Sequence, residues 1–380
     1  MGNSVYFRQS GVRLFALAEI GRRVAQSPDK PALVMLADGE DEVARLSYTE
    51  LDERSRDFAR YLQEQHLSGE RVLIMLPQGV EYVIAFIGCL YAGAIAVPVF
   101  PPSGSRNGER VNSVVADCQP ALAVVTARQE AAIRRQLPES CRTLVPTDVL
   151  AEGLPPLRPV APAADDVAYL QYTSGSTSTL GVMVTQDALA QQMRLLARAW
   201  RLSNDEVVVS WLPMFHDFGL VAATMYSLVS GATNVMMAPV AFVQHPFRWL
   251  DAISRYRAAV TFGPNFALDM SCDRVDDDAL QTLDLTSLRL LVVGAEPVRP
   301  APCAASPRGS ARRVPRRQLQ HRVRPGRGDP RCRALAGGAG ADGHRFDPVE
   351  LGRGRLVEVP DAGEAGSCPT TATGCSTPSC

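Results

Sequence analysis

Short apolar runs alternate with longer apolar or amphipathic segments through the central part of the chain. Apolar runs of about four to eight residues that stop at proline or glycine are typical of buried strands, and longer segments are typical of helices. This pattern predicts strands over residues 71–76, 94–100, 121–126, 168–172, 181–185, 206–213, 233–238, 258–262 and 288–295. It predicts helices over residues 80–94, 109–118, 187–202, 218–231 and 247–257. The alternation predicts an α/β fold with two stacked, doubly wound parallel sheets covered by helices.

Changes in composition divide the chain. Residues 150–164 are rich in Pro and Ala, and they are predicted to be a linker between two sheets. Residues 301–343 contain no Phe, Tyr, Trp, Ile or Met, so the segment 301–344 is predicted to be disordered. We therefore expect an N-terminal domain over residues 1–300, a short stretch of regular sequence over 345–366, and a disordered tail over 367–380.

Bulk composition narrows the function classes. The chain has 380 residues, of which 46% are hydrophobic, and a net charge of -1. This length supports a sizeable core, and the near-neutral charge gives no support for a nucleic-acid partner. The sequence lacks an apolar run of about 18 residues and an N-terminal signal peptide, so we expect a cytoplasmic protein without a transmembrane segment. The cysteines lack CxxC spacing, and no metal site is expected.

The loop between the strands at 168–172 and 181–185 gathers small hydroxyl side chains around one glycine. It contains Thr173, Ser174, Gly175, Ser176 and Thr177. Gly175 allows the backbone to approach a ligand closely, and successive backbone N–H groups in such a loop form an anion-binding concavity. The pattern therefore indicates a phosphate site. The alternative interpretation is a Ser/Thr-rich surface turn.

Further candidates follow the ends of predicted strands, where α/β sheets bind ligands. These residues are Phe215, His216, Gly263, Pro264, Asn265, Phe266, Gly294, Ala295, Glu296 and Pro297. The alternative for the glycine-containing runs is an ordinary turn from strand to helix. The alternative for His216, which precedes Asp217, is a hydrogen-bonding partner at the start of a helix.

Several motifs together resemble one family. YTSGST at residues 172–177, followed by GVMVT, resembles the phosphate-binding signature of adenylate-forming enzymes, which include acyl-CoA synthetases, luciferases and nonribosomal-peptide adenylation domains. The stretches at 92–104, 210–221 and 245–269 resemble the fatty acyl-AMP ligases within that group. The resemblance implies activation of a fatty acid by ATP and Mg²⁺ to an acyl-adenylate. The acyl group would then pass to an acyl carrier protein or a polyketide synthase.

The resemblance also implies roles for the candidate residues. The loop from Thr173 to Thr177 would hold phosphates, and His216 would lie beside the substrate carboxylate as the catalytic candidate. Phe215 and the run 263–266 would line the acyl pocket, and the run 294–297 would pack against adenine.

The chain departs from the family pattern in two places. The phosphate loop is one residue shorter than usual and lacks the family's proline and lysine. Residues 324–331, RPGRGDPR, stand where the family has Gly-Leu-Ala-Glu-Ala-Thr-Leu, and their codons read one base later admit that motif. We therefore interpret 301–344 as a frame-shifted segment, with a natural basic linker as the alternative. The segment 346–364 resembles the insertion that separates the ligases from acyl-CoA synthetases.

These departures predict that the chain, as a fragment ending after the N-terminal domain, has little adenylation activity. The motif glutamate that helps to hold magnesium and the C-terminal-domain lysine are both absent, so stabilisation of the transferring adenylyl group is reduced. Two alternative functions are a fatty acid–CoA ligase and a non-catalytic module that binds acyl groups or nucleotides.

Overall fold

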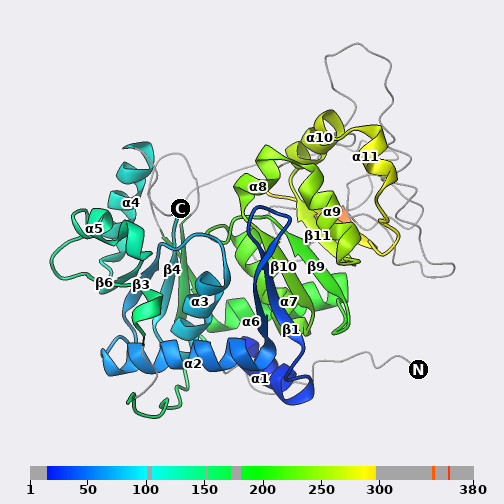
Figure 1. Ribbon diagram of the computed structural model, residues 1–380. Coiled ribbons are helices and arrows are strands. Elements are labelled where there is room, and N and C mark those ends of the chain that lie inside the picture. The colour runs from blue at the N-terminus through cyan, green and yellow to red at the C-terminus, as the bar shows by residue number, and fades with distance from the viewer. Residues whose placement is uncertain are drawn as a thin grey trace, which may run out of the picture.

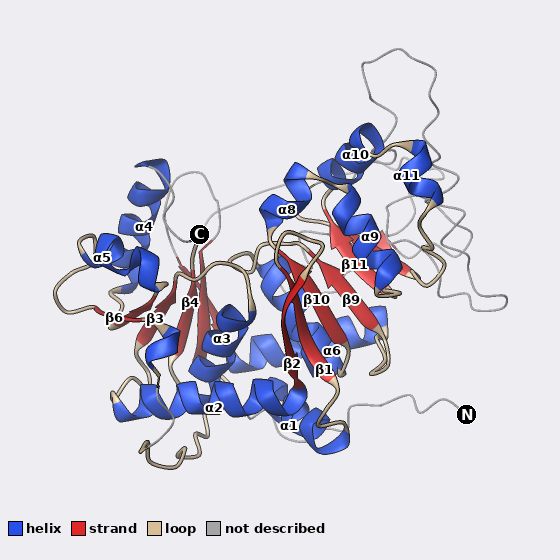
Figure 2. Ribbon diagram, in the orientation of Figure 1, coloured by secondary structure: helices blue, strands red, loops and turns tan. Residues whose placement is uncertain are grey.

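The computed structural model describes residues 15–100, 105–149, 153–172 and 181–296, together with the pairs 345–346 and 358–359 (Figures 1 and 2). Two sheets of the described region lie side by side, and helices cover both (Figure 2). The architecture is the α/β class that the alternating pattern predicts.

The first sheet has the strand order β12-β11-β9-β10-β1-β2. Its strands, in that order, are Leu290–Val293, Val260–Gly263, Val207–Ser210, Thr233–Met237, Pro31–Leu36 and Glu42–Ser47. Every residue of β10 is buried, as expected for a central strand covered on both faces. The N-terminal strand β1 lies beside β10, with Leu33 opposite Asn234, so segments about 200 residues apart in sequence form the middle of this sheet.

The second sheet has the order β6-β5-β3-β4-β7-β8. Its strands, in that order, are Arg142–Leu144, Leu122–Val124, Arg71–Ile74, Ile95–Pro98, Val167–Tyr172 and Gly181–Thr185. β8 is an edge strand, and its Val182 and Met183 side chains are exposed. The central strands β3 and β4 are buried except at their first residues.

Eleven α-helices belong to the described region. Their bounds, from α1 to α11, are Phe15–Gln26, Tyr48–Glu64, Val80–Ala92, Ser105–Cys118, Ala127–Arg134, Gln186–Trp200, Tyr226–Ser230, Pro239–Gln244, Phe247–Arg255, Asn265–Arg274 and Asp277–Gln281. A 3₁₀ turn covers Pro146–Asp148, and a π-helical segment covers Phe218–Met225. The predicted helix over 218–231 is thus two segments of different pitch.

Helix α3 joins the two sheets. It contacts β3 and β4 of the second sheet and β1 of the first, and every residue from Tyr82 to Ala92 is buried. It also packs closely on α2, because Gly88 lets Phe58 approach: a Cβ at position 88 would lie 2.6 Å from Phe58 Cδ1. Helix α2 begins with a capping box in which Ser47 Oγ accepts from the Glu50 N–H and Glu50 Oε2 accepts from the Ser47 N–H.

The sheets are mixed, and the expectation of parallel sheets throughout is wrong at two edges. β1 pairs antiparallel with β2, and β7 pairs antiparallel with β8. In both pairs a short loop joins consecutive strands, and only a crossover connection of a dozen or more residues allows parallel pairing. The other strand pairs of the two large sheets are parallel.

The predicted linker joins two strands of one sheet, so the expectation that it separates two sheets is wrong. The chain leaves edge strand β6 and returns as β7, next to β4. The described part of this segment lies against α2: Gln63 Nε2 donates to Arg158 O at 3.0 Å, and Arg158 N donates to Gln63 Oε1 at 2.9 Å. Pro and Ala residues make the segment extended and strand-free, but they do not determine which strands it connects.

The segments 301–344 and 367–380, for which we predict disorder, lie outside the described residues. Within 345–366, β13 (Arg345–Phe346) pairs antiparallel with β14 (Glu358–Val359). Among the helices described, none combines the length and apolar character that a bilayer crossing requires.

Candidate functional site

Three neighbouring parallel strands end at the same edge of the first sheet. β9, β11 and β12 are adjacent and parallel, and their last residues are Ser210, Gly263 and Val293. Most of the predicted site residues directly follow these strands. Parallel strands bring their carboxyl ends to one edge, which is where open α/β sheets bind ligands. We call this edge, formed by residues 211–218, 263–266 and 294–296, the carboxyl edge.

The ends of β11 and β12 are joined by a hydrogen bond between two predicted residues. The backbone N–H of Phe266, in the first turn of α10, donates to Glu296 Oε1 at 3.2 Å. Asn265 beside it is fully buried, whereas Phe266 is 43% exposed. Ala295 has a φ of 68°, a left-handed conformation that is uncommon for residues other than glycine. The run 294–296 therefore turns sharply after β12, and its glutamate reaches the start of α10.

Aromatic rings pack against the two glycines of the carboxyl edge. A Cβ on Gly294 would lie 3.3 Å from Phe218 Cζ, and a Cβ on Gly263 would lie 3.2 Å from Trp249 Cη2. Trp211, directly after β9, packs its ring edge-to-face with Phe266 at a centroid distance of 5.9 Å. The glycines thus allow large rings to fill the edge, which supplies an apolar floor for a ligand.

His216 and Asp217 form a close pair after β9. His216 Nδ1 lies 2.7 Å from Asp217 Oδ1, and both side chains are about half exposed. The hydrogen bond with Asp217 raises the pKa of His216 above its usual value, against a smaller opposing effect of burial. Burial would raise the pKa of Asp217, but the hydrogen bond and charge of His216 lower it below its usual range. The pair therefore places a half-exposed imidazole, whose pKa its acidic neighbour raises, at the carboxyl edge.

The hydrogen bonds of Asp217 also give the alternative interpretation of this pair physical support. Phe218 N, the first amide of the π-helical segment, donates to Asp217 Oδ1 at 2.7 Å. Asp217 therefore caps this segment and holds His216 at the same time.

The loop after β9 is held between the two sheets. Gln171 of β7 donates from Nε2 to Phe215 O at 2.9 Å, and its side chain is buried. The ring of Phe100, after β4, packs edge-to-face on the ring of Phe215 with centroids 5.1 Å apart. The end of β7, at Gln171, is therefore tied to the loop that carries Phe215 and His216.

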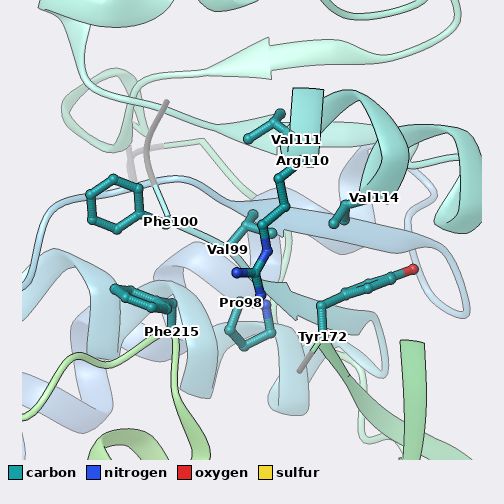
Figure 3. A pocket seen from close by; sticks show the side chains of 8 residues that line it. All are labelled: Pro98, Val99, Phe100, Arg110, Val111, Val114, Tyr172 and Phe215. Atoms are coloured by element: carbon teal, nitrogen blue, oxygen red, sulfur yellow. The ribbon is translucent and has the colours of Figure 1, made fainter. Parts of the chain in front are cut away.

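A pocket of about 250 Å³ adjoins this contact (Figure 3). Its lining residues are Pro98, Val99, Phe100, Arg110, Val111, Val114, Tyr172 and Phe215. Tyr172 directs its hydroxyl away from the pocket and donates to Asp117 Oδ2 at 2.6 Å (Figure 3). The pocket therefore has mostly apolar walls and one cationic side chain.

The structure brings together the predicted residues of runs 263–266 and 294–296, and it places Phe215 and His216 in the loop that follows the neighbouring strand β9. Pro297 and the loop residues Thr173, Ser174, Gly175, Ser176 and Thr177 lie outside the described residues, and their roles stay predictions. The sequence did not single out Gln171, Phe100, Trp211 or Arg110. Phe100 and Trp211 lie inside the stretches 92–104 and 210–221 that carry the family resemblance, which was the available signal.

No group of three or more potential metal ligands is found among the residues that the structure describes. The hydroxyl loop stays the predicted phosphate site.

Two mixed α/β sheets covered by helices are the fold of the N-terminal domain of adenylate-forming enzymes. Residues 20–307 match the family described as AMP-binding enzyme, and the chain belongs to this family.

The relatives include fatty-acid-activating enzymes. The medium-chain-fatty-acid–acyl-carrier-protein ligase JamA of Moorena producens is 37% identical over 284 residues, which are 71% of this chain and 47% of that protein. The long-chain-fatty-acid–AMP ligase FadD23 of Mycobacterium tuberculosis is 34% identical over 268 residues, 67% of this chain and 46% of that protein. The chain thus spans about half the length of these curated relatives.

Solved structures show the same similarity. The fatty acid AMP ligase of Legionella pneumophila matches with a TM-score of 0.72 and 29% identity, over 77% of this chain and 52% of that one. A fatty acyl-adenylate ligase of L. pneumophila in complex with acyl adenylate and pyrophosphate matches with a TM-score of 0.70 and 30% identity, over 76% of this chain and 51% of that one. The fold is therefore that of the N-terminal half of such ligases.

Proposed function

We propose that this chain forms the substrate-binding part of a fatty acyl-AMP ligase. In the proposed reaction, a fatty carboxylate attacks the α-phosphate of Mg-ATP, the bond to the β-phosphate oxygen breaks, and acyl-adenylate and pyrophosphate form. The observation that carries the proposal is the carboxyl edge, where the ends of β9, β11 and β12 bring His216, Phe266 and Glu296 to one side of the sheet.

The chain's own residues have distinct roles in this proposal. The hydroxyl loop from Thr173 to Thr177 holds the phosphates of ATP, and Gly294 to Pro297 pack against adenine. Phe215 and the run 263–266 line the acyl pocket. His216, which Asp217 holds at 2.7 Å and whose pKa that hydrogen bond raises, lies beside the reacting carboxylate. Such chemistry depends mainly on positioning and charge neutralisation.

We further propose that the acyl group is passed to an acyl carrier protein or a polyketide synthase, in the cytoplasm where ATP is available. The similarity to JamA, whose name states an acyl-carrier-protein acceptor, supports this acceptor over coenzyme A. The boundaries of the N-terminal domain at residues 1–300 and of the remnant at 345–366 are part of the same proposal.

We expect the chain as written to bind its ligands while turning over slowly. Residues 301–344 carry no glutamate motif for magnesium, and the phosphate loop is shortened. A misplacement near 1 Å in such a site costs about a hundredfold in rate.

The test combines binding and turnover. Calorimetry with a non-hydrolysable acyl-adenylate analogue measures binding, and ATP–pyrophosphate exchange measures adenylation. We expect the wild-type chain to bind the analogue, His216→Ala to weaken binding, and His245→Ala, an exposed histidine on α8's C-terminal side, to leave it unchanged. Failure of the wild-type chain to bind the analogue would refute the binding role. Robust exchange would refute the impaired turnover.

A further inference from the structure

The pocket beside Phe215 contains a cation that has no anionic partner in the described structure. Arg110 extends from α4 and points its guanidinium between Phe100 and Tyr172 toward Pro98 (Figure 3). None of the ion pairs between described residues includes Arg110. Arg110 is exposed, so an anionic ligand that enters the pocket can reach its guanidinium.

The walls of the pocket restrict the kind of anion. Phe100, Val111, Val114 and Phe215 present apolar surface around the guanidinium. A polyphosphate is bound by several N–H donors or cations together, whereas this pocket offers a single cation. The single guanidinium among apolar side chains is complementary to an organic anion that has one charged group and an apolar chain. A fatty carboxylate has this chemistry.

The volume of the pocket limits the length of the ligand's hydrocarbon chain. At roughly 30 Å³ for each small group, the share of liquid volume that one water molecule takes, a pocket of about 250 Å³ holds about eight heavy-atom groups. Six carbons and the two carboxylate oxygens make eight groups, so an acid of about six to eight carbons fills it, and a longer chain would extend past Phe100, which is 40% exposed.

We propose that this pocket is a holding site for a medium-length fatty acid, with its carboxylate on Arg110 and its chain along Phe100 and Phe215. The identity of the acid rests on the proposed function. The site shares Phe215 with the proposed acyl pocket but does not include the run 263–266, along which we place the acyl chain during adenylation. Phe215 lines the holding site and precedes His216, so an acid released from Arg110 lies next to the reacting centre.

The test measures binding of radiolabelled octanoate to the full chain by equilibrium dialysis. Arg110→Gln removes the charge, and Phe100→Ala removes an exposed wall. Arg128→Gln is the matched control, because Arg128 is an exposed arginine on α5 that does not line the pocket. Circular dichroism confirms that each variant is folded. The binding of an acyl-adenylate analogue and of Mg-ATP is measured on the same samples.

We expect Arg110→Gln to raise the octanoate Kd about tenfold. This is the effect of losing one charge-assisted hydrogen bond, reduced because Arg110 is exposed to water. Arg128→Gln should leave it unchanged. From butyrate to octanoate, wild-type affinity should rise about fourfold per methylene, and this gain should be smaller in Phe100→Ala. Beyond about eight carbons the gain should stop.

Three results would overturn the holding site. The first is equal octanoate affinity in wild type and Arg110→Gln. The second is an Arg110→Gln variant that loses affinity for Mg-ATP and keeps its affinity for octanoate, which would assign Arg110 to nucleotide phosphates. A wild-type chain that binds the analogue but not octanoate would refute the holding site and leave the proposed function intact. Octanoate binding that depends on Arg110 without any analogue binding would support the holding site and refute the proposed function.

Discussion

Gly219 is the position at which a single added methyl group should disturb the candidate site most. It lies in the first turn of the π-helical segment, and its N–H donates to His216 O at 3.0 Å. A Cβ at this position would lie 2.2 Å from Pro213 O, 2.7 Å from Pro213 C and 2.8 Å from Leu212 O. All three atoms belong to the backbone, so no change of side-chain rotamer relieves the contact.

The size of the effect follows from these distances. Ordinary van der Waals contact of a Cβ begins at 3.4 Å, so the chain around Pro213 must move by about 1 Å. Overpacking in a core usually costs about 1–3 kcal/mol, and a backbone clash belongs at the upper end of that range. We therefore expect Gly219→Ala to lower the free energy of unfolding by about 3 kcal/mol and Tm by about 5 °C. The same displacement should weaken binding of the acyl-adenylate analogue, because it moves His216.

Urea denaturation followed by circular dichroism measures the stability change. Gly21→Ala in α1 is the matched control, since no atom lies within 4 Å of the added Cβ. Alanine in a helix interior is favoured over glycine by about 1 kcal/mol, so this variant should be slightly more stable than wild type. A Gly219→Ala protein within 0.5 kcal/mol of wild type would show that the loop at Pro213 yields freely and that the argument from backbone contacts is wrong.

Three further changes test other parts of the structure. Asp217→Asn should lower the pKa of His216, seen by NMR titration of the ring, because the hydrogen bond to Asp217 is the main cause of its raised value. Because its folded pKa is raised, His216 contributes its full stabilisation below the unfolded pKa of 6.5 and loses it as pH rises through the folded pKa. Wild type should therefore lose more stability than Asp217→Asn over that pH range. Equal pH profiles for the two proteins would contradict the pairing of His216 with Asp217. Trp249→Phe removes the buried hydrogen bond from Nε1 to Thr261 Oγ1 at 2.8 Å and should cost about 2 kcal/mol in urea denaturation, whereas no loss would show that the bond contributes nothing net. Ser47→Ala removes the side-chain half of the α2 capping box and should cost about 1 kcal/mol by the same measurement, with an unchanged midpoint as the contrary result.

The pattern of the sequence predicts the central strands well because burial on both faces produces continuous apolar runs. β3, β10 and β12 each lie within a predicted strand, with ends shifted by a few residues. The order of the strands in each sheet could not be predicted from the pattern. The pairing of Leu33 with Asn234 depends on contacts between distant segments, which no local pattern encodes. The linker was misplaced for the same reason.

In the candidate site too, local sequence pattern predicted some features, and contacts between distant segments determined others. The residues of the carboxyl edge were predictable, since parallel strands that follow one another place their ends together. The hydrogen bond from Gln171 to Phe215 and the position of Arg110 above the pocket were not. Both depend on how the second sheet packs beside the first, and a glutamine inside a strand or an arginine on a helix carries no local signal of such a contact.

The contact between the sheets has a consequence for how the site works as a unit. Phe215 accepts a hydrogen bond from Gln171 and packs on Phe100, both from the second sheet, while its own strand belongs to the first. The proposed phosphate loop begins two residues after Gln171, and His216 follows Phe215 directly. A shift of one sheet against the other would therefore separate the proposed phosphate loop from His216, because each lies within two residues of the Gln171–Phe215 hydrogen bond. This short connection explains why a ligand that bridges the loop and His216 should also stabilise the packing of the two sheets, by an amount set by its affinity.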